Sequence, residues 1–181
     1  MNSFYTQKEL HSLGFKSIGD SVLISRNAKF YSPEKMVIGS HVRIDDYCIL
    51  SGSIVLGSYI HISAYSVLYG SKGIEMEDYS GISARCTIYS ATDDFSGDFL
   101  IGPMVDEQYT NVIGGKVVIK RFSQLGVGCV VFPNVIIEEG VAVGAMSLVN
   151  KSLLDWSIYA GVPVVKIKDR SKKLLNFLKN E

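Results

Sequence analysis

Two adjacent carboxylates, Asp93 and Asp94, stand where a regular pattern in the sequence breaks off. A carboxylate in such a place can hold an amine or accept its proton, and a neutral amine needs little further help because its lone pair is already available. The same residues also make good turn chemistry, since they precede Phe-Ser-Gly. Both interpretations stay open, and Asp94 is favoured over Asp93 as the group that holds an amine.

The histidines His11, His41 and His61 are the other candidates for proton transfer. A hydroxyl nucleophile would need such a base because its pKa is very high. A zinc site needs about three histidines converging at one place, and only His41 and His61 fall in the repeat described below, so a zinc enzyme is disfavoured. The aspartates are therefore candidate partners for an amine, and His61 or His41 is a candidate base for a hydroxyl; the residues alone leave both chemistries open.

The elements that position these residues follow a period of six. In residues 125–149 an apolar anchor recurs at every sixth position, and a small or β-branched residue follows four positions after each anchor. This period fits neither an α-helix nor a plain strand, but it fits a parallel β-helix with three six-residue edges per coil. The register continues back to Ile18 with two eight-residue edges, interpreted as bulges, and predicts an all-β solenoid of about six coils.

The segments outside this register define the organisation of the chain. Residues 1–17 are predicted to form a short cap helix, with Thr6 and Glu9 as its capping box. Residues 18–150 form the solenoid, interrupted by an extended loop at 93–116 whose aromatic and aliphatic residues favour packing on something such as a neighbouring subunit. Residues 151–181 form a C-terminal extension, with an amphipathic helix expected from 169 to 180.

Composition excludes several classes. The 181 residues are 47% hydrophobic with a formal net charge of zero, which argues against a nucleic-acid-binding face. No apolar run is long enough for a membrane span, and the first residues do not resemble a secretory signal. Cys48, Cys86 and Cys129 all occupy small corner positions, which favours buried reduced thiols in a cytoplasmic protein over a catalytic cysteine.

The hexads, the long loop and the closing YAGVPVVKIK together resemble the hexapeptide-repeat acyltransferases, whose fold is a left-handed parallel β-helix. The resemblance covers nearly the whole chain and is close to the galactoside and maltose O-acetyltransferases. The stretch MEDYSGISARCTIYSATDDFSG is more similar to the N-acyltransferases that modify nucleotide-linked 4-amino-4,6-dideoxy sugars in the viosamine and anthrose pathways. The resemblance implies a homotrimer with active sites between adjacent subunits, and acetyl-CoA lying along each cleft.

It also implies roles for particular residues. The backbone N–H of Val127, in a turn with Gly126 and Gly128, would lie near the thioester carbonyl, where a fixed donor stabilises the developing oxyanion. The remaining residues implied to bind CoA are Gly144, Ala145 and Ser147 against the pantetheine arm, Asn150 and Lys151 as a polar pair, and Lys166 and Lys168 for the phosphates. The glycines could equally be required by the tight corners of the coils, without any contact to CoA. The lysines could equally belong to a solvent-exposed helix face.

The family's O-acetyltransferases begin the long loop with a catalytic histidine, whereas Asp93 stands at the matching position here. This departure shifts the expectation towards an amine acceptor. Three further residues are candidates for substrate binding: Ser83 for the sugar or its phosphate, His61 from an adjacent subunit, and Glu139 near the cleft. Each could also be an ordinary surface residue.

The expected function is therefore acyl-CoA-dependent N-acylation of a nucleotide-linked amino sugar such as dTDP-4-amino-4,6-dideoxyglucose, with acetyl as the default group, in surface polysaccharide (O-antigen or capsule) biosynthesis. No metal is expected, and the amine attacks the thioester directly. An O-acetyltransferase with a histidine base and a non-catalytic β-helix scaffold remain as alternatives.

Overall fold

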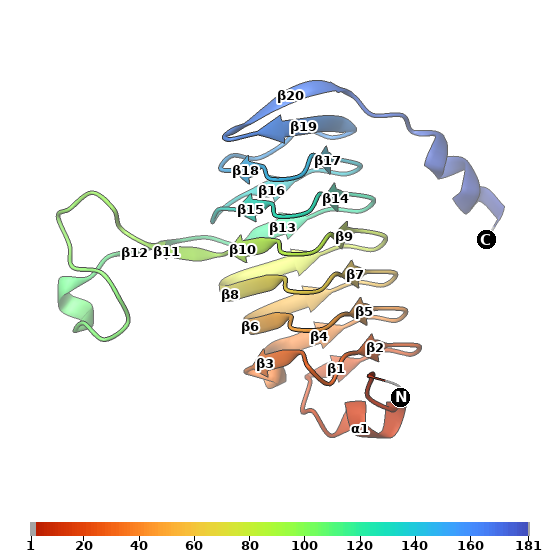
Figure 1. The fold of residues 1–181 in the computed structure, drawn as a ribbon, viewed down its shortest axis with the longest axis horizontal. Coiled ribbons are helices and arrows are strands. Elements are labelled where there is room, and N and C mark those ends of the chain that lie inside the picture. Colours follow the sequence, from red (N-terminus) through yellow and green to blue (C-terminus); the bar gives the residue numbers. More distant parts are fainter. Residues whose placement is uncertain (1–2, 181) are drawn as a thin grey trace.

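Short parallel strands stack into three faces that enclose a triangular prism in the computed structural model, which describes residues 3–180 (Figure 1). We number the faces in chain order. Face 1 contains β1 (Ser17–Ile18), β4 (Met36–Ile38), the second half of β6 (Ile49–Leu56), the second half of β8 (Val67–Met76), β13 (Val117–Ile119) and β16 (Ile136–Ile137).

The strands of the other two faces are also stacked in chain order. Face 2 contains β2 (Leu23–Ile24), β5 (Arg43–Ile44), β7 (His61–Ile62), β9 (Gly81–Ile82), β14 (Gln124–Leu125), β17 (Ala142–Val143) and β19 (Ser157–Gly161). Face 3 contains β3 (Lys29–Tyr31), the first halves of β6 and β8, β10 (Thr87–Tyr89), β15 (Val130–Val131) and β18 (Leu148–Val149). These strands make six complete coils, and the bridge from Ile137 to Leu153 begins a seventh, slightly beyond the predicted number.

The anchors of the period of six point into the prism, as predicted. Leu50, Ile62, Leu125 and Ile137 are fully buried, because an inward position in a coil contacts only the coils above and below it and the opposite faces. The eight-residue edges are bulges, one containing the 3-10 turn η1 (Pro33–Lys35) and the other shifting the register between β6 and β8. The three cysteines are buried and free.

A short helix stands at the N-terminal end of the prism (Figure 1). Helix α1 (Gln7–His11) begins after Thr6, whose side chain and that of Glu9 make the predicted capping box. Its Leu10 is buried and joins the core cluster, where the first coil would otherwise expose its interior. No helix within residues 3–180 is long and apolar enough to cross a membrane.

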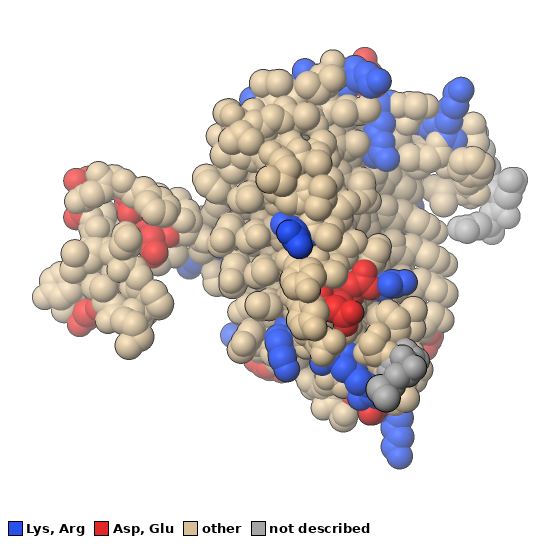
Figure 2. Space-filling model, in the orientation of Figure 1, with Lys and Arg blue, Asp and Glu red and all other residues tan. Residues whose placement is uncertain are grey.

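The interruption in the repeat forms an arm that stands away from the prism (Figure 1). Its root is an antiparallel pair of strands, β11 (Ala91–Asp93) and β12 (Val112–Gly114), and the 3-10 turn η2 (Glu107–Tyr109) lies further out. Phe95 and Met104 are 80% and 96% exposed, so this chain leaves much of the arm's apolar surface uncovered. Acidic side chains mark the arm in Figure 2, which shows no basic ones beyond its root.

The C-terminal extension differs from the prediction of a helix starting at residue 169. Residues Val164–Asp169 form β20, which pairs antiparallel with β19 at the end of the prism. The Arg170 guanidinium then donates to the carbonyls of Phe122 (2.7 Å) and Gly140 (3.0 Å), which anchors the chain. The helix η3 (Lys173–Asn180) therefore starts later, and it is a 3-10 helix.

Candidate active site

The predicted site residues gather at two different corners of the prism. Corner 2, between faces 2 and 3, is built from the stacked turns Ala64–Tyr65, Ala84–Arg85, Val127–Gly128 and Ala145–Met146, linked by hydrogen bonds from one coil to the next. Corner 3, between faces 3 and 1, carries the root of the arm. Strand β10, one whole edge of face 3, separates the two corners within a single chain.

Val127 occupies the outer position of its turn at corner 2. Its carbonyl accepts from the Met146 N–H (2.8 Å), and Gly128 next to it donates to the Ala84 carbonyl (2.9 Å). Within residues 3–180 the Val127 N–H itself has no hydrogen-bond acceptor, and the side chain is 43% exposed. The turn therefore leaves one backbone N–H without a partner in the described part of the chain, as an oxyanion-binding donor requires.

The glycines of this corner are explained first by coil packing. A Cβ on Gly126 would lie 2.6 Å from the Ala145 backbone nitrogen of the next coil, and one on Gly144 would lie 3.0 Å from the Ala160 Cβ. Gly128 also has a φ of +70°, which a glycine adopts without strain. Gly126, Gly128 and Gly144 thus shape the surface beside Val127, and Ala145 remains exposed there.

Ser147 does not fit its expected role against a cofactor. Its side chain is 2% exposed, donates to the Gly144 carbonyl (2.8 Å) and accepts from the Gly161 N–H (3.0 Å). Because its hydroxyl is enclosed and already bonded, Ser147 stabilises the corner and is unavailable to a ligand.

Ser83 lies one coil below Val127, on the side towards the N-terminus. Its backbone N–H donates to the Leu125 carbonyl (2.9 Å), and its hydroxyl accepts from Gln124 (3.4 Å). The Gln124 amide also donates to the Leu125 carbonyl (3.2 Å). The structure thus brings Ser83 to the Val127 turn, together with Gln124, which the sequence analysis did not single out.

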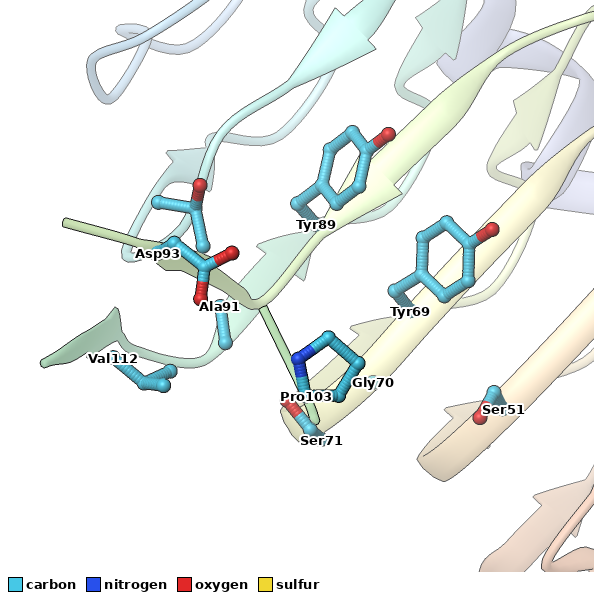
Figure 3. A pocket seen from close by; sticks show the side chains of 10 residues that line it. Ser51, Tyr69, Gly70, Ser71, Tyr89, Ala91, Asp93, Pro103 and Val112 are labelled. Atoms are coloured by element: carbon cyan, nitrogen blue, oxygen red, sulfur yellow. The ribbon is translucent and has the colours of Figure 1, made fainter. Parts of the chain in front are cut away.

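A cavity of about 550 Å³ opens at corner 3, at the root of the arm. Figure 3 shows the stacked rings of Tyr69 and Tyr89 along one side of it and Asp93 with Pro103 along another. Ser51 and Ser71 add hydroxyl groups to the lining. The combination of aromatic faces, hydroxyls and one carboxylate suits a polar ring carrying an amine, such as an amino sugar.

Asp94 takes part in the arm's own structure instead. Its carboxylate accepts from the Ser96 N–H (2.7 Å) and from the Asn111 side chain (2.7 Å), and it does not line the cavity that Asp93 lines. The hydrogen bonds from Ser96 and then Asn111 lower the pKa of Asp94 below its ordinary value, which makes it a weaker base.

Several other candidates lie apart from Val127 within one chain. His61 is on face 2, hydrogen-bonded to Asp45 (2.7 Å), whose pKa is lowered because the bonds from His61 and Arg43 outweigh partial burial. Glu139 is at corner 1, between faces 1 and 2, where its carbonyl accepts from Trp156. Asn150 and Lys151 are exposed at corner 3, past the end of β18.

The two lysines expected at the CoA phosphates lie on β20. Lys166 pairs with Asp169 (2.7 Å), an acceptor that raises the pKa of Lys166 and lowers that of Asp169, whereas Lys168 is exposed. Basic side chains gather around this end of the prism in Figure 2. Trp156 is 6% exposed and packs near Phe122 under Lys172, so it fills the end of the core.

A single chain therefore carries two separate groups of candidate site residues, one at each corner. Corner 2 presents the Val127 N–H and a surface of small residues, and corner 3 presents a carboxylate in a ligand-sized cavity. Tyr69, Tyr89 and Arg85 could not be singled out from the sequence, because outward positions of a coil tolerate any residue and carry no periodic signal.

Comparison with known proteins agrees with this chemistry. No model of a protein family matches the sequence. The chain is 40% identical to a dTDP-4-amino-4,6-dideoxy-D-glucose acyltransferase of Escherichia coli over 176 residues, which is 96% of this chain and 92% of that one.

The solved structure of AntD, an N-acyltransferase from Bacillus cereus, is similar throughout. In complex with dTDP and 3-hydroxybutyryl-CoA, AntD is 54% identical to this chain with a TM-score of 0.97, and the match covers 99% of this chain and 96% of AntD. A serine-to-alanine variant of AntD, solved with dTDP-4-amino-4,6-dideoxyglucose and coenzyme A, matches over 100% of both chains. A hexapeptide-repeat acetyltransferase of Vibrio cholerae shares the fold at 16% identity, with a TM-score of 0.61 over 94% of this chain and 85% of that one.

Proposed function

Because the chain belongs to the hexapeptide-repeat N-acyltransferases of nucleotide-linked amino sugars, we propose that it acylates the 4-amino group of dTDP-4-amino-4,6-dideoxyglucose with an acyl group from acyl-CoA. The observation that carries this proposal is the carboxylate of Asp93 in the corner 3 cavity. An amine needs only such a partner, whereas a hydroxyl would need a stronger base.

The reaction is a direct displacement. The neutral sugar amine attacks the thioester carbonyl, and the Val127 N–H stabilises the tetrahedral oxyanion. As the intermediate collapses, the C–S bond breaks, the new amide nitrogen gives its proton to Asp93, and the coenzyme A thiolate takes up a proton. No covalent intermediate with the protein forms.

Asp93 rather than Asp94 is assigned to the amine. Sequence reasoning favoured Asp94, but its carboxylate already accepts two hydrogen bonds inside the arm. Asp93 faces the cavity, and it stands where the related O-acetyltransferases carry their histidine. Asp94 instead keeps the root of the arm in shape.

The complete site requires a second copy of the chain, in a homotrimer. The arm of one subunit brings Asp93 to corner 2 of its neighbour, where Val127 lies. The exposed apolar side chains of the arm, among them Phe95 and Met104, support this arrangement because they need a surface to cover them. Asn150 and Lys151, at the same corner as the arm, then reach the neighbour's acyl-CoA.

The donor is acyl-CoA, with acetyl as the first group to test. A longer 3-hydroxybutyryl group is the second, because AntD has been solved with that donor. Gly144 and Ala145 flank the pantetheine arm, and Lys166 with Lys168 holds phosphates. The enzyme acts in the cytoplasm, and its product serves as a building block for surface polysaccharide.

The test is release of free thiol from acetyl-CoA and 3-hydroxybutyryl-CoA with two matched acceptors. These are dTDP-4-amino-4,6-dideoxyglucose and the same nucleotide sugar with a hydroxyl at C4. Thiol release with the amine alone, and an amide in the product by mass spectrometry, would support N-acyl transfer. Equal turnover of the hydroxyl compound would contradict it, and failure to bind coenzyme A would favour a scaffold.

A further inference from the structure

Arg85 is the charged residue nearest to Val127 along corner 2. The turn Ala84–Arg85 lies one coil below the turn Val127–Gly128, because Gly128 donates to the Ala84 carbonyl over 2.9 Å. Successive coils are about 4.8 Å apart, so the Arg85 side chain leaves the prism within reach of a ligand bound at Val127.

The guanidinium of Arg85 has no carboxylate partner. Of the five arginines, Arg26 pairs with Glu9, Arg43 with Asp45, and Arg170 donates to backbone carbonyls. Within residues 3–180, Arg85 forms no ion pair, and its contact is with the ring of Tyr65, 5.7 Å from the ring centroid. Arg85 is exposed, so its hydrogen-bond donors remain available to a ligand.

The surroundings of Arg85 favour an anion. The neighbouring turns, Ala64–Tyr65 below and Val127–Gly128 above, carry no carboxylate that would compete for the guanidinium. Tyr65 is 53% exposed and stacks on Tyr47 at 5.0 Å, so the arginine rests on a flat aromatic surface that limits its freedom. A planar guanidinium held in this way binds phosphate oxygens in a two-pronged geometry.

The position of Arg85 distinguishes between the two phosphorylated substrates. The lysines of β20 lie towards the C-terminal end of the prism from Val127, whereas Arg85 lies towards the N-terminal end. In the acceptor the reacting amine is on C4 and the diphosphate is on C1, at opposite ends of the sugar ring. An amine placed beneath the Val127 N–H therefore directs the diphosphate away from coenzyme A and towards Arg85.

We propose that Arg85 binds the diphosphate of the nucleotide sugar, and that Tyr65 is a positioning residue that holds the guanidinium in place. This assignment rests on the proposed function. It makes Arg85 a determinant of acceptor binding, separate from the lysines that serve the acyl donor.

The test is calorimetric titration of dTDP and coenzyme A, separately, into the wild-type protein and three variants. Arg85→Ala is expected to weaken dTDP binding about 10- to 100-fold, the effect of losing a charge-assisted contact, and to leave coenzyme A binding unchanged. Arg85→Lys keeps the charge without the two-pronged geometry and is expected to lose less. Arg121→Ala is the matched control, since Arg121 also lies over a ring, that of Phe122, but at corner 1.

Kinetics separate the role of Tyr65 from a structural one. Tyr65→Phe keeps the ring and is expected to retain the wild-type KM for the nucleotide sugar, whereas Tyr65→Ala should raise this KM with kcat little changed. Unchanged dTDP binding in Arg85→Ala, or weaker binding of coenzyme A in place of dTDP, would overturn the assignment while leaving the proposed function intact. Absence of dTDP binding by the wild-type protein would overturn both.

Discussion

Asn111 donates a side-chain hydrogen bond to the Asp94 carboxylate over 2.7 Å and so ties the two sides of the arm together at its root. The backbone reinforces this tie, because the Asp94 N–H donates to the Asn111 carbonyl (3.0 Å). Asp93 is the last residue of β11, and successive side chains of a strand point to opposite sides, so Asp93 and Asp94 face different surroundings. One aspartate therefore shapes the arm while the other faces the cavity.

The first prediction concerns these two aspartates. Asp93→Asn should lower kcat by about 10²- to 10⁴-fold, because it removes the group that accepts the amine's proton. Asp94→Asn preserves a side-chain oxygen that accepts from the Ser96 N–H, so it should lower kcat less than Asp93→Asn does. Steady-state kinetics with the amino sugar would compare the two, and the reverse order would return the catalytic role to Asp94.

The second prediction concerns the pH dependence of the arm. Hydrogen bonds from Ser96 and Asn111 lower the pKa of Asp94 in the folded protein. The ionised form therefore stabilises the arm fully above the ordinary pKa of about 4, and this contribution is lost as the pH falls through the lowered value. Hydrogen exchange of residues 95–111, corrected for intrinsic rates, should speed up in that range relative to residues 125–149.

The control for this pH effect is Asp94→Asn, which cannot ionise. In this variant the amide hydrogens of the arm should not exchange faster as the pH falls through that range. An identical step in both proteins would assign the effect to another group.

The third prediction concerns the oxyanion donor. Gly128 has a positive φ, so Val127 occupies the turn position at which proline is common, and Val127→Pro should remove the N–H while keeping the turn. We expect kcat to fall about 10²- to 10³-fold, the usual cost of one oxyanion donor. Ala64→Pro, at the equivalent position two coils below, should keep the wild-type kcat. Equal losses in both variants would point to a general effect of proline on the corner.

The fourth prediction concerns stability along corner 1. His41, Tyr59, Tyr79, Phe122 and Trp156 follow one another from coil to coil in contact there. Trp156 is nearly buried at one end, and Trp156→Ala should lower the free energy of unfolding by about 3–5 kcal/mol.

His41, at the exposed end of the same row, provides the comparison. His41→Asn keeps a side chain that tolerates the left-handed backbone and should change stability by less than about 1 kcal/mol. Denaturant unfolding would measure both variants. Similar losses at the two ends would contradict the role assigned to burial.

The solenoid could be predicted because each inward position accepts only an apolar side chain, and that requirement repeats every six residues. The same pattern already placed Ser147 at a small corner position, so its burial could have been inferred. The direction of the arm, the facing of Asp93 and the β19–β20 hairpin depend on single non-repeating contacts, such as those of Asn111 and Arg170, which leave no periodic signal. Outward residues such as Arg85 became interpretable only once the coils had been stacked.

The central claim is that corner 2 of one chain and the arm of another complete each active site. The most direct measurement mixes two inactive variants, Asp93→Asn and Val127→Pro, by joint unfolding and refolding, and then assays thiol release with the amino sugar. If the site is shared, random mixing should restore about a quarter of the wild-type activity, because every mixed trimer contains one interface with both native residues. If size measurements show that mixed oligomers have formed but no activity returns, the shared site is contradicted. Asp93 and Val127 would then act together within one chain.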